Sequence, residues 1–410
     1  MKKTSYSLSA LLILIISTLA CSFSFGSGTR QPNSQDEVAT VVAATLQALT
    51  PASPGETSTS TPTGMLPYSF YYLGTDGTGL TQVFRIERDG TTPRQITFEP
   101  VNVGNYDVSL VDGNVIYVVN NQLMWINADG SGRRVLVDGG AVDPNNPILN
   151  SLSNPVFSPD GQTIAYGYKG LNLYSVATGV SNLVLETEVV DPVNGETRTG
   201  QLYWPEKYSP DGTKLIITIA IPNSDGVFDA IYYPATNSIV RFNSTDNAFI
   251  CCGEEEWTQD SSGFYAANPT VGMFGSGLWR VDAASGIVTT LLPTDAGGGN
   301  FNLADEPYLA SDSQLYFFYT TASSPDGIIQ RSPLQLVRSA PDGVTGRTVL
   351  NTENFQLLNE ALWAPDASLV IVAYAPIQDV YQGGQAEIVF LDGRPNVVLT
   401  TFAQNMKWGP

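Results

Sequence analysis

Six acidic residues recur at matching places along the chain, each shortly before a large hydrophobic residue. They are Glu206, Glu254, Glu255, Asp305, Glu306 and Glu360. Carboxylates gathered in one place can hold a hard cation such as Ca²⁺, attract a cationic peptide, or hydrolyse a glycosidic bond when two of them flank it. A fourth interpretation is a solvated acidic rim, which a chain with a formal charge of −20 would show without any ligand.

Two cysteines lie beside one of these acidic groups. Cys251 and Cys252 are adjacent in sequence and precede Glu254 by two residues or more. In an oxidising compartment they could form a vicinal disulfide, which is strained because adjacent Cα atoms lie only about 3.8 Å apart. The alternative is a pair of thiols in a tight loop. The sequence has no C-x-x-C redox motif.

The composition excludes several classes of protein. None of the 410 residues is histidine, which removes Ser-His-Asp and Cys-His nucleophile systems and histidine metal sites. The 39 acidic residues against 19 basic ones argue against nucleic acid as a partner. A hydrophobic content of 42% excludes wholesale disorder, and 38 glycines with 26 prolines indicate many turns.

The N-terminus resembles a bacterial lipoprotein signal. Lys2 and Lys3 precede an apolar run, residues 8–19, that is too short to span a membrane. The run ends at Thr-Leu-Ala-Cys, which resembles a lipobox. The resemblance implies that Cys21 is diacylated, that residues 1–20 are removed, and that the protein is extracytoplasmic and held to a bacterial membrane by this lipid. An ordinary secretory signal with a chance cysteine is the alternative.

Residues 21–66 are expected to be a tether between this anchor and a folded body. Gln35–Leu49 has the apolar spacing of a short helix, and the residues after it are rich in Ser, Thr and Pro. Such a composition forms an extended spacer and no core. The mature chain would keep 17 basic and 39 acidic residues, a charge of −22, so attachment to a membrane depends on the lipid.

From residue 67 onward a short pattern returns about every 50 residues. The tetrapeptide Ser-Pro-Asp-Gly at 158–161 returns at 209–212. Degenerate copies place the position of its proline, which we call the repeat column, at 111, 259, 311, 365 and 410. A large residue stands two places before this column in six of the seven copies. These residues are Phe157, Tyr208, Trp257, Leu309, Trp363 and Trp408. A period of this length with strand-like contents predicts a β-propeller.

Each repeat contains runs for four antiparallel strands, which make one blade. The first repeat lacks a leading strand, and the chain ends in one, Met406–Pro410, with nothing after it. We therefore predict an all-β fold: a seven-bladed propeller over residues 67–410, in which the C-terminal strand completes the first blade. Such closure also removes exposed sheet edges.

The repeat resembles that of TolB-type propellers, which is also found in the propellers of prolyl-oligopeptidase relatives. The resemblance covers nearly all of residues 67–410 and implies the fold. Members of this group include periplasmic assembly proteins, binding modules and gates of peptidases, so the resemblance does not imply one function. No histidine and no hydrolase domain accompany the propeller here, which argues against a peptidase.

In such propellers the first strands line a central channel, and the loops before the first strand and after the second share one face. The six acidic residues would then ring one mouth of the channel. The longest loops of the chain, among them residues 187–203 and 294–304, fall on the same face, and others of these loops carry Phe228, Phe274 and Tyr381. Loops on a rigid scaffold commonly bind partners, although neutral drift of loop length is the alternative.

We therefore expect a lipid-anchored propeller that binds an envelope protein or peptide through this face. The alternatives are a carboxylate-dependent glycan hydrolase and a cation-binding structural or sensor propeller. We expect a monomer without a cofactor, with Ca²⁺ as the one candidate ion. The Ser-Pro-Asp-Gly segments are interpreted as turns, because proline, aspartate and glycine each favour turn geometry.

Overall fold

The computed structural model describes residues 64–410 except 145–146, 191–196, 222–225, 244–247, 249, 252–254, 272–274 and 324–330. The signal segment, Cys21 and nearly all of the tether lie outside these residues, so the predictions made for them stay predictions. No helix of the described part is long and apolar enough to cross a membrane.

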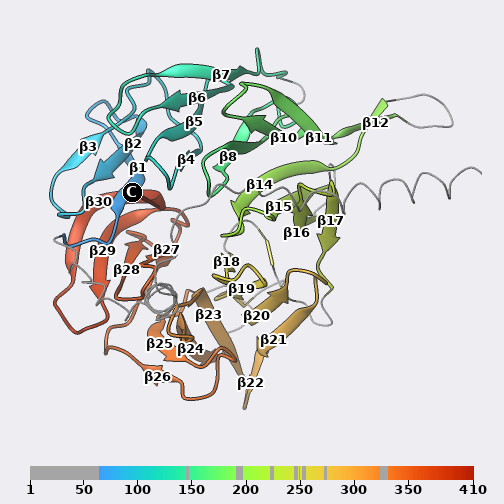
Figure 1. The fold of residues 1–410 in the computed structure, drawn as a ribbon. Helices are drawn as coiled ribbons and strands as arrows, with labels where there is room; N and C mark the ends of the chain where they lie inside the picture. The colour runs from blue at the N-terminus through green and yellow to red at the C-terminus, as the bar shows by residue number, and fades with distance from the viewer. Residues whose placement is uncertain are drawn as a thin grey trace, which may run out of the picture. The chain divides into compact units, whose positions relative to one another are not determined.

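All elements in the described residues are β-strands, and they group into antiparallel blades around a ring (Figure 1). Blade 2 consists of β4 (Tyr106–Val108), β5 (Val115–Val119), β6 (Gln122–Ile126) and β7 (Arg134–Asp138). Blade 3 consists of β8 (Ser153–Phe157), β9 (Thr163–Gly167), β10 (Gly170–Ser175) and β11 (Ser181–Glu186). Blade 4 consists of β14 (Leu202–Tyr208), β15 (Leu215–Ala220), β16 (Val227–Tyr233) and β17 (Ser238–Arg241).

The remaining blades follow the same plan. Blade 5 consists of β18 (Glu256–Trp257), β19 (Gly263–Asn268), β20 (Gly277–Asp282) and β21 (Val288–Leu292). Blade 6 consists of β23 (Asn300–Leu309), β24 (Leu315–Ser323), β25 (Gln335–Ser339) and β26 (Thr348–Val349). Blade 7 consists of β27 (Leu358–Trp363), β28 (Leu369–Tyr374), β29 (Gly384–Phe390) and the first half of β30 (Val397–Gly409). Blade 1 consists of the second half of β30, β1 (Ser69–Thr75), β2 (Thr81–Ile86) and β3 (Pro93–Gln95).

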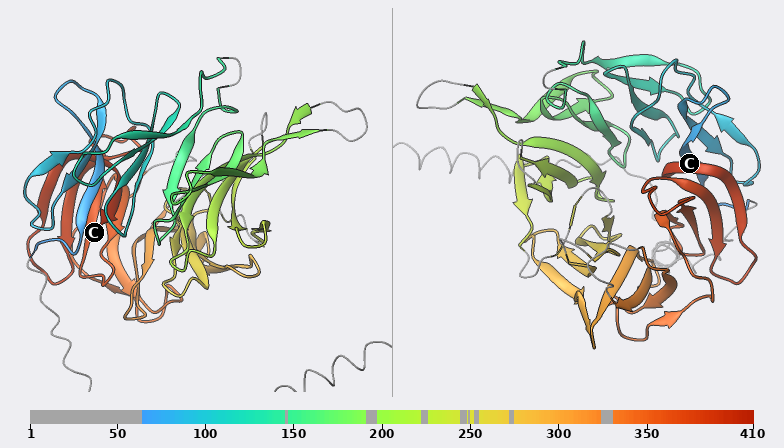
Figure 2. Two further views of the ribbon diagram at one scale, coloured as in Figure 1. Left: turned by 45° about the horizontal axis from the view of Figure 1, so that its top comes forward. Right: turned by 180° about the vertical axis from the view of Figure 1, so that it is seen from behind.

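Strand β30 closes the ring, as the sequence predicted. Its first half pairs with β29, for example Val398 with Glu387. Its second half pairs with β1, with Trp408 opposite Phe70 and Gly409 opposite Ser69. The C-terminus therefore lies beside the first described strand (Figures 1 and 2).

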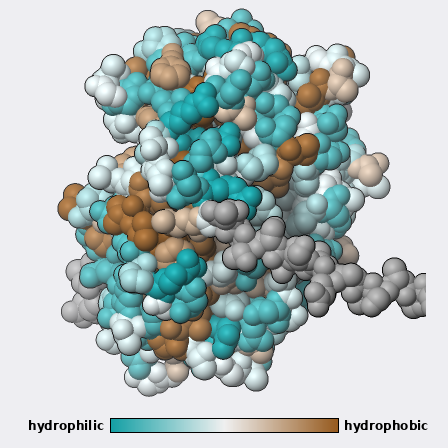
Figure 3. Space-filling view, turned by 60° about the vertical axis from the view of Figure 1, so that its left-hand side comes forward, coloured by the Kyte–Doolittle hydropathy of each residue, from teal (hydrophilic) through white to brown (hydrophobic). Residues whose placement is uncertain are grey.

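The core of the described residues is divided among the contacts between blades. Its buried side chains form seven clusters, and each cluster joins two neighbouring blades, including blade 7 with blade 1. A closed ring of seven blades has the same number of blade–blade contacts. The predicted all-β propeller is confirmed, and apolar residues that remain on its outer side stand in patches between hydrophilic ones (Figure 3).

Two segments expected as long loops form strands instead. Residues 187–203 contain the hairpin β12 (Glu188–Val190) and β13 (Thr197–Thr199), which projects away from the ring in Figures 1 and 2. Residues 294–304 contain β22 (Asp295–Gly297), which adds a fifth strand to blade 6. Glycines at 297–299 allow the tight reversal between β22 and β23, because all three adopt positive φ.

The Ser-Pro-Asp-Gly segments are turns. In the first copy Asp160 accepts hydrogen bonds from the Ser158 hydroxyl at 2.6 Å and the Gln162 amide at 3.0 Å. Gly161 takes a φ of 68°, which a residue with a side chain rarely adopts. The second copy repeats the serine contact, with Ser209 Oγ donating to Asp211 at 2.6 Å. The acidic residues of these turns are thus bound to their own turn.

Candidate functional site at the channel mouth

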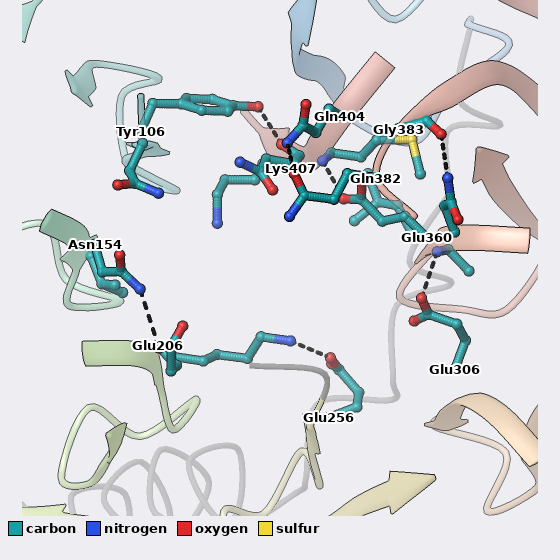
Figure 4. Close-up of a pocket in the computed structure, with 18 of the residues that line it drawn as sticks. Tyr106, Asn154, Glu206, Glu256, Glu306, Glu360, Gln382, Gly383, Gln404 and Lys407 are labelled. Carbon is teal, nitrogen blue, oxygen red and sulfur yellow. Dashed lines mark hydrogen bonds and ion pairs between the residues drawn. The ribbon is translucent and has the colours of Figure 1, made fainter. Parts of the chain in front are cut away.

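A cavity of about 500 Å³ lies where the first strands converge. Its walls include residues of all seven first strands: β4, β8, β14, β18, β23, β27 and β30. Charged and amide side chains reach into it from opposite blades (Figure 4). Each blade thus contributes residues of its first strand to the cavity, so all seven repeats take part in forming it.

The first strands are irregular at the level of the cavity. Five of them, β8, β14, β23, β27 and β30, carry a β-bulge in which the extra residue belongs to the first strand. At three of these bulges the residues Asn154, Glu306 and Asn405 have φ between 46° and 52°. A bulge redirects side chains that a regular strand would hold at fixed angles. Here it brings polar side chains to the neighbouring blade.

Two predicted acidic residues connect adjacent blades in this way. Glu306 on β23 accepts a hydrogen bond from the main-chain amide of Ala361 on β27 at 3.0 Å. Glu360 on β27 accepts one from the amide of Met406 on β30. Burial raises the pKa of Glu360 to about 7, although this amide and Lys407 oppose the increase. Both carboxyl groups therefore help to close the ring.

A third predicted acidic residue belongs to a buried carboxyl cluster. Glu206 on β14 and Asp229 on β16 both contact the hydroxyl of Thr218, at 2.9 and 2.7 Å respectively. A hydroxyl group has one proton, so it cannot donate to both carboxylates at once. Both contacts are hydrogen bonds when one of the two carboxyl groups carries a proton and donates it to this hydroxyl.

Burial and the repulsion between neighbouring carboxylates favour protonation of these carboxyl groups. Burial, with the nearby Asp229, raises the pKa of Glu206 to about 7. Glu255 is 2% exposed, and burial together with Asp229 raises its pKa well above the ordinary range. These groups titrate as a unit, because each charge disfavours the next.

Two lysines that the sequence reasoning missed also face the channel. Lys207 donates to Glu256 at 2.7 Å and to the Glu255 carbonyl at 3.1 Å. Lys407 pairs with Asp107 at 3.2 Å. Both lysines stand three places before the repeat column, as Glu256 does. Comparing the repeats at that position would have found them, and they show that the mouth carries both signs of charge.

The other predicted site residues are placed differently. Asp305 does not line the channel cavity and instead borders an adjoining groove. Cys251 is disulfide-bonded and buried, whereas Cys252, Glu254 and Phe274 lie outside the described residues. The vicinal pairing stays a prediction. In the described part of the chain no group of three or more Asp, Glu and Cys residues could hold a metal ion.

The adjoining groove, of about 260 Å³, lies between blades 6 and 7. Its walls include three buried apolar side chains, Leu334, Phe355 and Leu358. It shares Glu306, Asn359 and Tyr381 with the channel cavity, so the two spaces adjoin. We call it the blade 6–7 groove.

Comparison with known proteins shows the fold alone. No protein-family model matches the sequence, and no curated protein matches it. Similar solved structures include TolB from Acinetobacter baumannii, with 16% identity over 93% of this chain and 74% of that one and a TM-score of 0.44. Another, from a structural and mechanistic study of two prolyl endopeptidases, has 12% identity, covers 83% of this chain and has a TM-score of 0.51. This chain spans about half of that one, with 49% covered. The predicted propeller fold is confirmed, and identities this low leave the activity open.

Proposed function

We propose that this chain is an extracytoplasmic propeller, anchored by lipid on Cys21, which binds a protein or peptide segment of the cell envelope through its channel mouth. The observation that carries the proposal is the cavity of about 500 Å³ to which all seven first strands contribute. Cavities of this size and concave form are where proteins bind ligands. The expected charge of −22 keeps the body away from anionic lipid surfaces and leaves membrane attachment to the lipid.

The chemistry of the cavity supports a peptide as the ligand. Amide side chains of Gln382, Gln404 and Asn105 line it, and each offers a donor and an acceptor, as a peptide main chain does. The glycan-hydrolase alternative needs two carboxyl groups directed at a substrate. Glu306 and Glu360 instead accept main-chain hydrogen bonds from the next blade, which favours binding over hydrolysis.

Site-specific photo-crosslinking in the envelope tests the proposal. A photoreactive amino acid replaces Gln404 in the cavity or, as a matched control, Val349, which is 51% exposed on the outer strand β26. We expect a discrete protein or peptide adduct from position 404 that is missing from position 349. No adduct at 404, or the same adducts from both positions, would contradict binding through the channel mouth.

A further inference from the structure

The blade 6–7 groove is less polar than the channel cavity, and its walls combine polar and apolar side chains. Phe355 is fully buried, and Leu334 and Leu358 are 3% and 6% exposed. Leu357 also lines the groove and holds a φ of 60°, a left-handed conformation that is uncommon for leucine. Such backbone outliers persist where the surrounding structure requires them. The volume of about 260 Å³ has room for one large apolar side chain.

Arg331 forms part of the wall of this groove, and its guanidinium already makes hydrogen bonds within that wall. Its guanidinium donates to the Val380 carbonyl at 2.9 Å, to the Leu358 carbonyl and to the Asn359 side chain at 2.5 Å. It also lies 5.5 Å from the ring centre of Tyr381. Because its donors hold three parts of the wall, Arg331 positions the wall and is not directed at an incoming anion.

Tyr381 marks the border between the two compartments. It lines both of them, and 63% of its surface is exposed, which is high for an aromatic residue. Exposed tyrosines at the centre of a binding surface commonly contribute much of the affinity. A segment that enters the groove and continues into the channel has to pass this ring.

The charges of the two compartments favour a basic segment. Five carboxyl groups line them: Glu206, Glu256, Asp305, Glu306 and Glu360. Three cationic groups line them as well: Lys207, Arg331 and Lys407. The excess of acid complements a cation, and an incoming cation favours the ionised form of the buried carboxyl groups.

From this arrangement we infer that the segment bound at the channel mouth carries a large apolar side chain, which fills the blade 6–7 groove, within a few residues of a lysine or arginine that enters the channel cavity. The inference rests on the proposed function and names the chemistry of its partner. Apolar burial in the groove supplies affinity, and the basic residue supplies orientation through charge complementarity.

The test is selection from a phage-displayed library of random dodecapeptides on the full mature chain, purified without lipid as the Cys21→Ser variant. We expect enriched peptides to combine Leu, Ile, Phe or Trp with a nearby Lys or Arg. Replacing the apolar residue by Ala, or the basic residue by Glu, should each weaken binding of the synthetic peptide at least about tenfold. Enrichment of acidic peptides, or of peptides that tolerate both replacements, would overturn the inference.

Variants of the chain separate the groove from the channel. Tyr381→Ala should weaken the selected peptide at least about tenfold, whereas the matched control Phe98→Ala removes a 75% exposed aromatic residue elsewhere and should change nothing. Unchanged thermal unfolding of both variants shows that the fold is intact. Binding that is lost in Gln404→Trp but kept in Tyr381→Ala would refute the groove while leaving the proposed function standing. Absence of any selected peptide, or binding unaffected by both variants, would contradict both.

Discussion

Glu206 and Glu360 are half-buried carboxyl groups on β14 and β27, and both face the channel cavity. Burial raises the pKa of each to about 7. A carboxyl group with a higher pKa in the folded chain than in the unfolded chain binds its proton more tightly when folded. Its effect on folding is therefore most favourable below about pH 4.5, and the free energy of unfolding decreases as the pH rises toward 7.

We predict that Glu206→Gln flattens this dependence. Glutamine keeps an oxygen that accepts from Asn154 and Thr218 and removes the charge. With about 1.4 kcal/mol for each pH unit of pKa difference, the variant should gain up to roughly 3 kcal/mol relative to the natural chain at pH 8. Little difference is expected at pH 4.

Urea denaturation at a series of pH values measures the effect. The matched control is Glu186→Gln, an exposed position on the outer strand β11. The control should leave the pH dependence of the free energy of unfolding unchanged. Parallel profiles for Glu206→Gln and the natural chain would show that Glu206 is ionised in the fold and would refute the prediction.

The repeat predicted part of the acidic lining of the channel but not what these residues contact. Glu255 and Asp305 do not line the cavity, whereas Glu256 does. Glu206, Glu306 and Glu360 do line the cavity, as their repeat positions implied. Their hydrogen bonds depend on bulges, which a strand pattern of strict alternation does not contain. Pro155, Pro205 and Pro307 at those bulges are the available signal, because proline within a sheet is confined to edge strands and such irregularities.

At the level of elements, indole groups join consecutive first strands. Trp363 on β27 donates to the Glu306 carbonyl on β23 at 3.0 Å. Trp408 on β30 donates to the Trp363 carbonyl at 2.8 Å. Trp257 on β18 donates to the Lys207 carbonyl on β14 at 3.3 Å. The tryptophans two places before the repeat column thus connect each of these blades to the preceding one through a hydrogen bond.

Replacement of Trp408 separates its packing from its hydrogen bond. Trp408→Ala also removes ring contacts with Tyr68 and Phe70 and should cost about 3 kcal/mol of the free energy of unfolding. Trp408→Phe keeps most of the apolar contact and should cost about 1 kcal/mol for the lost hydrogen bond. Guanidinium denaturation measures both values. Equal losses in the two variants, or losses below about 0.5 kcal/mol, would argue against this division.

At the scale of the whole molecule, ring closure depends on the second half of β30. Without it the edge of β1 would be open, and Phe70, Tyr71 and Tyr72, now at most 3% exposed, would lose their cover. The sequence predicted this closure because the first repeat lacks a strand and the last residues supply one. It did not predict the hairpin β12–β13, whose residues it indicated as part of a long loop.

A chain that ends at Ala403 should lose its cooperative thermal transition and form aggregates, because open strand edges pair with other chains. Thermal denaturation and size-exclusion chromatography measure both effects. The control ends at Gly409 and lacks only Pro410, whose carbonyl accepts the Ser69 hydroxyl at 2.9 Å. A truncated chain that melts like the control would show that blade 1 is stable with three strands.

The closing strand also sets an order in time. Ser69 and Pro410 are 341 residues apart, and the first strand of blade 1 is the last to be synthesised. At roughly 5–20 residues per second, β1 waits on the order of 20 to 70 seconds for its partner. During that interval the blades already synthesised form an open arc. The contact that closes it joins residues 341 positions apart, the largest separation of any hydrogen bond among the described residues. A nascent chain is therefore kept from its stable form until its end is free.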